Sequence, residues 1–167
     1  MRKKDWIDVH KYASQPIVCQ YQPWGPNTEI DSKDFVKQVV EDAKLAPRSR
    51  YVFAVFDQEN NQMIGSGEFN LRDPSNKVGE IAYIINPDFW GKGIATEVAK
   101  LLIEFGFKAF HLHRIYATCD PRNSGSIKVL EKIGMTKEGR MREDLSIQDR
   151  WRDSLLYSIL EQEFRTR

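Results

Sequence analysis

Cysteine is scarce in this sequence, and long hydrophobic runs are missing. Only two of the 167 residues are cysteines, Cys19 and Cys119, and neither belongs to a C-x-x-C pair or a zinc-ligand spacing. This pattern excludes a disulfide scaffold and predicts no metal site, so we interpret both cysteines as small buried apolar residues. No apolar run approaches the roughly 20 residues that span a bilayer. None follows the basic start Arg2–Lys4 either, so we expect no membrane segment and no signal peptide.

An excess of charge of one sign is missing as well. Lys and Arg number 25 and Asp and Glu 24, which gives a net charge of +1. Bulk electrostatic binding to nucleic acid or to an anionic membrane is therefore not expected, although a local basic pocket is compatible with this balance. Hydrophobic residues make up 41% of the chain, too many for a disordered protein. We predict one cytoplasmic domain over residues 1–167 that needs no disulfide or metal for its stability.

The hydrophobic pattern predicts helices and strands along most of the chain. A short helix is expected around Trp6–Ala13, followed by an irregular loop. A second helix is expected to begin with Asp31 as its cap and to end before Pro47. Strands are predicted at Tyr51–Phe56, Met63–Asn70, Glu80–Asn86, His113–Cys119, about Thr136–Arg142 and about Arg152–Leu160.

A longer helix is predicted between the third and the fourth of these strands. Apolar residues recur there at helical spacing from about Ala95 to Phe110. A shorter helix is predicted after the fourth strand, with Ser124 as its cap and Gly134 at its end. A strand–helix–strand unit of this length places its two strands parallel, with a right-handed crossover. The predicted fold class is α+β, with a mixed sheet whose centre is parallel.

Two glycines separate the third predicted strand from the longer helix. Gly91 and Gly93, with Lys92 between them, precede a helix start, where unpaired N–H groups and a partial positive charge suit an anion such as phosphate. The alternative is a tight turn between strand and helix, and the glycines alone do not decide between the two. The segment lacks the third glycine of a dinucleotide fingerprint, and no Ser or Thr follows Lys92 as in a nucleoside triphosphate loop.

The same segment resembles the acyl-CoA pyrophosphate loop of the GNAT N-acetyltransferase superfamily. That loop has Gln or Arg, two further residues, Gly, one residue, and Gly or Ala. Gly91 to Ala95 match it, while Trp90 stands in place of the usual Gln or Arg. The tryptophan, in the run FWGKGIATE, is similar to the branch that contains the ribosomal-protein N-terminal acetyltransferases. Segments 123–135 and 138–157 resemble later elements of that branch, so the similarity covers roughly residues 15–164.

The resemblance implies a GNAT fold of the α+β class. It has a mixed, mostly antiparallel sheet with a central splayed parallel pair, flanked by helices. The family usually opens with a strand ahead of the residues that correspond to Trp6–Ala13, and this sequence starts after it; either Met1 is a late start or the strand is missing. The sheet edge left open there would need cover, because unpaired edges invite pairing.

The resemblance also implies how acetyl-CoA, the expected cosubstrate, would bind. Main-chain groups of Tyr83, Ile84 and Ile85 would meet the pantetheine and the acetyl group. Asn123 would hydrogen-bond the pantetheine arm, and Ser126 would lie near the sulfur, where it could protonate the leaving thiolate. The pyrophosphate would be held by the backbone amides of Gly91, Lys92, Gly93, Ile94, Ala95 and Thr96.

The implied chemistry is direct attack of a neutral amine on a thioester within a ternary complex, with no covalent enzyme intermediate. A base must remove one proton from the amine. Glu80 is the first candidate and Glu68, on the neighbouring strand, the second; the alternative for each is a purely structural carboxylate. Trp24, Glu68 and Trp90 are expected to contact the acceptor, although such aromatic residues are often simply part of a core.

The acceptor amine stays open at this point. An α-amine titrates near 7.7–8.0 and a lysine amine near 10.4, so a lysine costs about 3–4 kcal/mol more to deprotonate, which favours an α-amine or a small amine of lowered pKa. The alternatives are a small amine of the polyamine, amino-acid or aminoglycoside type, and a non-catalytic acyl-CoA-binding module. A homodimer is compatible with the sequence. Either a solvated hairpin or a site that recruits an acidic acceptor is expected for Arg140, Arg142, Arg150 and Arg152.

Overall fold

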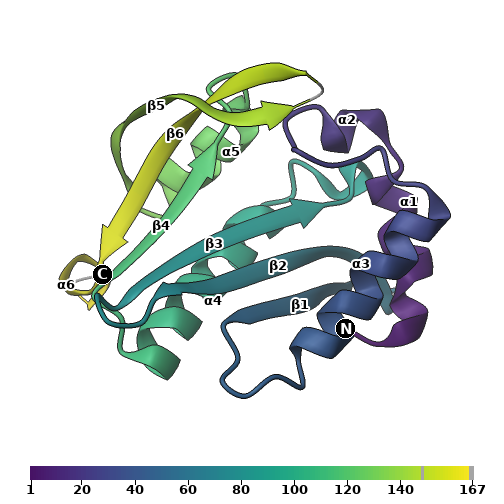
Figure 1. Ribbon diagram of the computed structural model, residues 1–167, viewed down its shortest axis with the longest axis horizontal. Helices are drawn as coiled ribbons and strands as arrows, with labels where there is room; N and C mark the ends of the chain where they lie inside the picture. The colour runs from purple at the N-terminus through teal and green to yellow at the C-terminus, as the bar shows by residue number, and fades with distance from the viewer. Residues whose placement is uncertain (148, 166–167) are drawn as a thin grey trace.

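The computed structural model describes residues 1–147 and 149–165, which form a six-stranded sheet with helices on both faces (Figure 1). The strands are β1 (Arg50–Asp57), β2 (Gln62–Asp73), β3 (Val78–Ile85), β4 (Arg114–Cys119), β5 (Thr136–Ile147) and β6 (Arg150–Leu160). The helices are α1 (Trp6–Ala13), α2 (Pro16–Cys19), α3 (Glu29–Asp42), α4 (Ile94–Phe110), α5 (Ser124–Lys132) and α6 (Glu161–Arg165). Single turns of 3-10 helix lie at Lys3–Asp5 and Pro87–Phe89.

The sheet has the strand order β1-β2-β3-β4-β6-β5, and only the central pair β3 and β4 is parallel. Helix α4 forms the crossover between these two strands, because a parallel connection needs an intervening element. The α+β class and the parallel centre are confirmed. Residues 1–49, all of which the structure describes, contain no strand, so β1 is an edge strand as expected.

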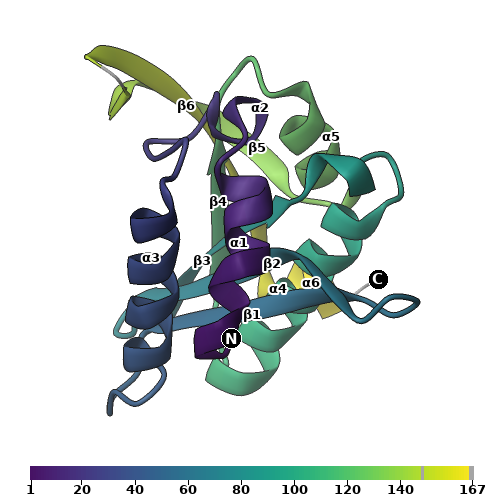
Figure 2. The ribbon, with the colours of Figure 1, turned by 90° about the vertical axis from the view of Figure 1, so that its right-hand side faces the viewer.

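Helices α1 and α3 lie on one face of the sheet, and α4 and α5 lie on the other (Figure 2). The core on the α4 side is built around Phe69, which is completely buried. Gly79 and Gly106 make room for this ring, since a Cβ on either would come within 2.7 Å of it. The smaller core on the other face joins α1, α3 and the sheet through Val9, Val36 and their neighbours. Burying a side chain such as Phe69 contributes about 1.5–3 kcal/mol.

Both predicted helix caps were wrong for the same reason, by three residues in α3 and by one residue in α5. Helix α3 is capped by Thr28, and Asp31 is the return residue of a capping box: the Asp31 N–H donates to Thr28 Oγ1 (3.2 Å) and the Thr28 N–H to Asp31 Oδ2 (2.8 Å). The helix ends at Asp42, well before Pro47. Helix α5 is capped by Asn123 in place of Ser124. Several adjacent residues of each segment can cap, and only the backbone conformation selects one.

The short helices α2 and α6 were not predicted, because four or five residues carry too little periodicity to reveal a helix. The predicted strands are all present, and most are longer than expected; β2 and β5 each contain 12 residues. Within the described residues, no helix combines the length and apolarity needed to cross a membrane.

Candidate active site

The central strands β3 and β4 pair only at their beginnings. Their register joins Val78 to Arg114, Gly79 to Ile115 and Glu80 to Tyr116, and beyond this point the two strands diverge (Figure 1). This is the splayed parallel pair that the resemblance implied. It leaves the second half of β3 unpaired along one edge, while its other edge remains paired with β2.

The register of β2 and β3 determines which main-chain groups face the gap. The Asn86 N–H donates to Ile64 O on the β2 side at 2.8 Å. Because N–H and C=O groups alternate along a strand, those of Ile84 also point to β2, while those of Tyr83 and Ile85 point into the gap. Of the three residues expected to meet pantetheine through the main chain, two are therefore directed towards it.

The N-terminus of α4 presents free N–H groups beside the end of β3. Its first intrahelical bond runs from the Glu97 N–H to Gly93 O at 3.1 Å, so the N–H groups of residues 94–96 have no intrahelical acceptor. Gly91 (φ 77°) and Gly93 (φ 80°) both adopt the left-handed conformation that favours glycine. A Cβ on either would meet nothing within 4 Å, so the space over the loop is open. These features fit the pyrophosphate of an acyl-CoA.

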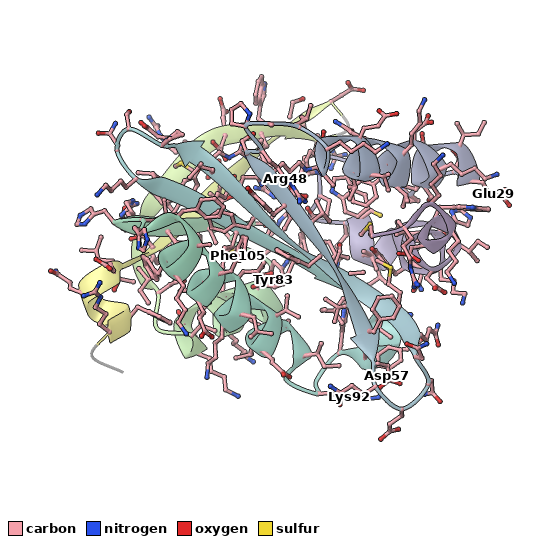
Figure 3. All side chains as sticks on the ribbon, turned by 90° about the horizontal axis from the view of Figure 1, so that it is seen from below. Glu29, Arg48, Asp57, Tyr83, Lys92 and Phe105 are labelled. Carbon is pink, nitrogen blue, oxygen red and sulfur yellow. The ribbon has the colours of Figure 1, made fainter. Side chains whose placement is uncertain are left out.

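Trp90 and Lys92 lie at the edge of this loop. The Trp90 indole Nε1–H donates to Ile85 O at 2.7 Å, which occupies a carbonyl that faces the gap. The side chain is 48% exposed and does not line the cavity described below. The Lys92 Nζ lies 4.7 Å from the ring centroid of Phe89. In Figure 3, Lys92 lies at the edge of the view, whereas Tyr83, which is half-buried, lies near its centre.

A cavity of about 910 Å³ opens where β3 and β4 separate. All six strands, the helices α1, α3 and α5 and the loop between α2 and α3 contribute to its walls, so it joins segments from most of the chain. Of the residues singled out in the sequence, it brings together Trp24, Glu68, Glu80, Tyr83, Ile84, Asn123 and Ser126. Ile85, Trp90 and residues 91–96 do not line it.

Ser126 and the hydroxyl of Tyr83 face each other in this cavity. Burial raises the pKa of Tyr83 above its usual value, and the side chain of Ser126 lowers it in part. The Tyr83 hydroxyl is buried and makes no hydrogen bond of normal geometry to the described residues. Asn123 holds the turn by accepting the Ser126 N–H at Oδ1 (3.0 Å). Tyr83 therefore stays protonated at neutral pH, next to the residue expected to act as an acid.

The two candidate bases differ in how fully their oxygens are bonded. Both oxygens of Glu68 accept from Arg50, at 2.9 Å each, and Asn70 donates to Oε1 at 2.9 Å. Glu80 accepts from Arg72 through Oε2 only, at 2.6 Å, and no bond to its Oε1 is formed by the residues the structure describes. Both carboxylates therefore form an ion pair with an arginine, but only Glu80 keeps one oxygen for a water or a proton.

The cysteines are buried, as predicted, and do not form a nucleophilic site. Burial is the main cause that raises the pKa of Cys119 to about 11, and it also raises the pKa of Cys19. Both therefore remain thiols at neutral pH, and it is the thiolate that attacks. In the described part of the chain, no three His, Cys, Asp or Glu side chains form a group that could hold a metal ion.

Three side-chain polar groups of the cavity were not predicted from the sequence to belong to the site. These are the hydroxyls of Tyr12 and Tyr83 and the guanidinium of Arg152. Arg152 is only 9% exposed, so this arginine of the hairpin is not solvated, unlike Arg150, which is exposed. Arg152, Ser154 and Ser158 are separated by even numbers of residues along β6, so their side chains lie on the same face of the strand, and all three are buried. This spacing was the available signal that Arg152 points into the protein.

The family model of the acetyltransferase (GNAT) domain matches residues 1–136 of this chain. The chain belongs to the GNAT acetyltransferase family. Members of this family use acetyl-CoA, whose pyrophosphate and pantetheine fit the loop and the gap described above.

Curated relatives of this acetyltransferase differ in their acceptors. An uncharacterized N-acetyltransferase of Bacillus subtilis, YnaD, is 37% identical over 96% of this chain and 91% of its own length. The spermidine N(1)-acetyltransferase of Escherichia coli is 31% identical over 98% of this chain and 85% of its own length. The [ribosomal protein uS5]-alanine N-acetyltransferase of Escherichia coli is 31% identical over 66% of this chain and 58% of its own length. The superfamily is confirmed, while the ribosomal-protein branch is supported only in part.

Solved structures share the architecture. A GNAT-family acetyltransferase from Bacillus anthracis superposes with a TM-score of 0.85 at 36% identity, covering 98% of this chain and 93% of that chain. A spermidine N-acetyltransferase from Vibrio cholerae, in complex with CoA and spermine, superposes with a TM-score of 0.83 at 21% identity, covering 99% and 95%. The second comparison establishes the common fold.

Proposed function

We propose that this acetyltransferase transfers the acetyl group of acetyl-CoA to a primary amine, either a protein N-terminal α-amine or a small amine, by direct attack in a ternary complex. The observation that carries this proposal is the separation of β3 and β4. It leaves a free strand edge that leads from the N-terminus of α4 to the cavity described above. The amine would approach from the cavity.

The residues of the chain would divide the work as follows. The N–H groups of residues 91–96 would bind the pyrophosphate, and Asn123 and the gap-facing main-chain groups of Tyr83 would hold the pantetheine arm. Acetyl-CoA supplies the activated acetyl thioester. The Ile85 N–H points into the gap and would donate to the acetyl oxygen, where negative charge develops. Trp24 and Glu68 would form part of the acceptor wall, and Trp90 would cover the end of β3.

Two side chains would transfer the protons of the reaction, one as a base and one as an acid. Glu80 would accept the proton of the amine through a water at its unbonded Oε1, and Glu68 would remain structural. Ser126 would hold the proton destined for the leaving sulfur, with the protonated Tyr83 hydroxyl behind it. The high pKa of Cys119 makes an acyl-cysteine route unfavourable.

The test is a thermal melt with acetyl-CoA, CoA, ATP and NAD, followed by amine-dependent release of CoA. A ligand at 100 times its Kd adds about 2.7 kcal/mol, or roughly 5–10 °C for a domain of this size. We expect that shift with acetyl-CoA and CoA only. Gly93→Ala should reduce it, because alanine is strained at φ 80°, whereas Gly139→Ala, whose Cβ would meet nothing within 4 Å, should not.

Three results would contradict the proposal in different ways. If acetyl-CoA produces no shift, the loop is only a turn. An equal shift with ATP would indicate a nucleotide site instead. If acetyl-CoA binds but no amine is acetylated, the protein is a non-catalytic acyl-CoA-binding module.

A further inference from the structure

Three buried side-chain polar atoms have no hydrogen-bond partner among the described residues, and all three belong to one cavity. They are Tyr12 Oη, Tyr83 Oη and Arg152 Nε. The residues are distant in sequence, on α1, β3 and β6. A buried donor without a partner destabilises the folded state, so it is uncommon in folded proteins. The side chains of Ser66 and Ser126 lie near the two tyrosine hydroxyls and act on them, so the Nε–H of Arg152 is the group that most needs a ligand there.

Arg152 decides what kind of ligand fits. A tyrosine hydroxyl can either donate or accept, but a guanidinium N–H can only donate. Arg152 Nη1 donates to Tyr21 O at 2.7 Å and Nη2 to Ser154 Oγ at 2.5 Å, which holds the group from two sides. Its Nε–H therefore has a fixed position and needs an oxygen or another acceptor.

The charge of Arg152 is also left without a direct counterion in the described part of the chain. No described carboxylate forms an ion pair with it. Asp120 acts on Arg152 only through its electrostatic field, because both its oxygens accept from Arg122, at 3.0 and 2.8 Å. A buried cation in this state favours a ligand with a negative or partly negative oxygen.

The position of Arg152 assigns that oxygen to the acceptor side of the site. Its bond to Tyr21 ties β6 to the loop between α2 and α3, which lies with α1 and α3 on one face of the sheet. The helix α4, whose N-terminus would bind the pyrophosphate, covers the opposite face. The acyl-CoA loop and Arg152 thus approach the gap from different sides.

We infer that Arg152 binds a carbonyl or carboxylate oxygen next to the acceptor amine, so that the acceptor is a peptide N-terminus or an amino-acid derivative and not a polyamine. This inference rests on the proposed function. A polyamine has only N–H groups and positive charges, so it would leave the Nε–H unpaired and would be repelled by the guanidinium. An α-amine next to a carbonyl presents the required oxygen three bonds away from the reacting nitrogen.

The experiment measures kcat/KM of the wild type and of Arg152→Met for four amines. Trialanine and free alanine carry an oxygen beside the α-amine, as an amide carbonyl and as a carboxylate; isopropylamine and spermidine carry none. We expect the wild type to prefer trialanine and alanine. The relative rates of these two should show whether Arg152 binds an amide carbonyl or a carboxylate. Arg152→Met should lower kcat/KM by about 10- to 100-fold for the preferred acceptor, as for a lost charged hydrogen bond. The values for isopropylamine should change less than threefold.

Matched control variants distinguish loss of the Arg152 contact from a general change in charge or folding. Arg150→Met removes an exposed arginine of the same strand and should change nothing. Arg152→Lys keeps the charge with less disturbance of packing, and should show a partial loss if methionine prevents folding. The KM for acetyl-CoA should stay within threefold in every variant. Preference for spermidine in the wild type, or an equal loss on all amines, would overturn the inference. If no amine reacts although acetyl-CoA binds, the proposed function itself has failed.

Discussion

The two halves of the β3–β4 pair are built from the same strands but differ in how their polar groups are bonded. In the closed half, around Val78–Glu80, the backbone is paired and the side chains form ion pairs across the sheet. Arg72 bonds Glu80, and Arg114 joins Glu138 and Ser158. In the open half, the free edge of β3 borders a cavity in which the hydroxyl of Tyr83 and Nε of Arg152 are buried without partners.

The difference implies that one half of this strand pair contributes mainly to stability and the other mainly to function. Polar groups that are satisfied within the chain lower the free energy of the folded state, whereas unsatisfied ones raise it until a ligand bonds them. The closed half would therefore determine stability, and the open half would determine binding and turnover. The following variants sharpen or break that division.

The largest effect is expected in the open half, at Ser126. Ser126→Ala should lower kcat about 100-fold, since general acid catalysis typically contributes 10²- to 10⁴-fold, while the KM for acetyl-CoA and the melting temperature change little. Ser124→Ala, two residues earlier on the same helix, is the matched control and should retain its activity. Steady-state kinetics decide the matter, and an unchanged kcat would remove Ser126 from the acid role.

An intermediate effect is expected where the two halves meet, at the two glutamates. Glu80→Gln should lower kcat/KM about 10- to 100-fold, because Glu80 retains an unbonded oxygen that can accept the proton. Glu68→Gln removes a carboxylate that bonds Arg50 twice, and should lower the melting temperature more than the rate. The opposite pattern would make Glu68 the base and Glu80 the structural residue.

The smallest effect is expected in the closed half, at Glu138. The hydrogen bond from Arg114, first, and that from Ser158, second, lower the pKa of Glu138 to about 2. A lowered pKa means that the stabilisation is complete above the usual value of 4.5 and is lost as the pH falls from there towards 2. Because the side chain is 38% exposed, Glu138→Gln should cost less than about 1 kcal/mol of the unfolding free energy at pH 7.

The difference in unfolding free energy between wild type and Glu138→Gln, followed by urea titration from pH 7 to pH 3, should therefore shrink as the pH falls. The rate of acetyl transfer at pH 7 should stay the same. If Glu138→Gln, in the closed half, retained wild-type stability but lost turnover, the division between the two halves would be wrong.

Local pattern was sufficient for much of the fold. The spacing of apolar residues between Ala95 and Phe110 predicted α4 almost to the residue, and the strand–helix–strand order predicted the parallel pair. The caps of α3 and α5 were misplaced, because Thr28 and Asn123 compete with neighbours of equal capping strength. The inward direction of Arg152 was missed, since an arginine in a charged hairpin has no local mark of burial.

The sequence by itself determined the elements, the glycine loop and the membership of a family, because each depends on residues within a few positions of one another. Only the tertiary structure decided where β3 and β4 part and which side chains meet in the space between them. Tyr12, Tyr83 and Arg152 come together from α1, β3 and β6, and the register of whole strands sets their distances. Burial then makes these groups potential ligand-binding groups, since a donor without a partner is unfavourable only where water cannot reach it.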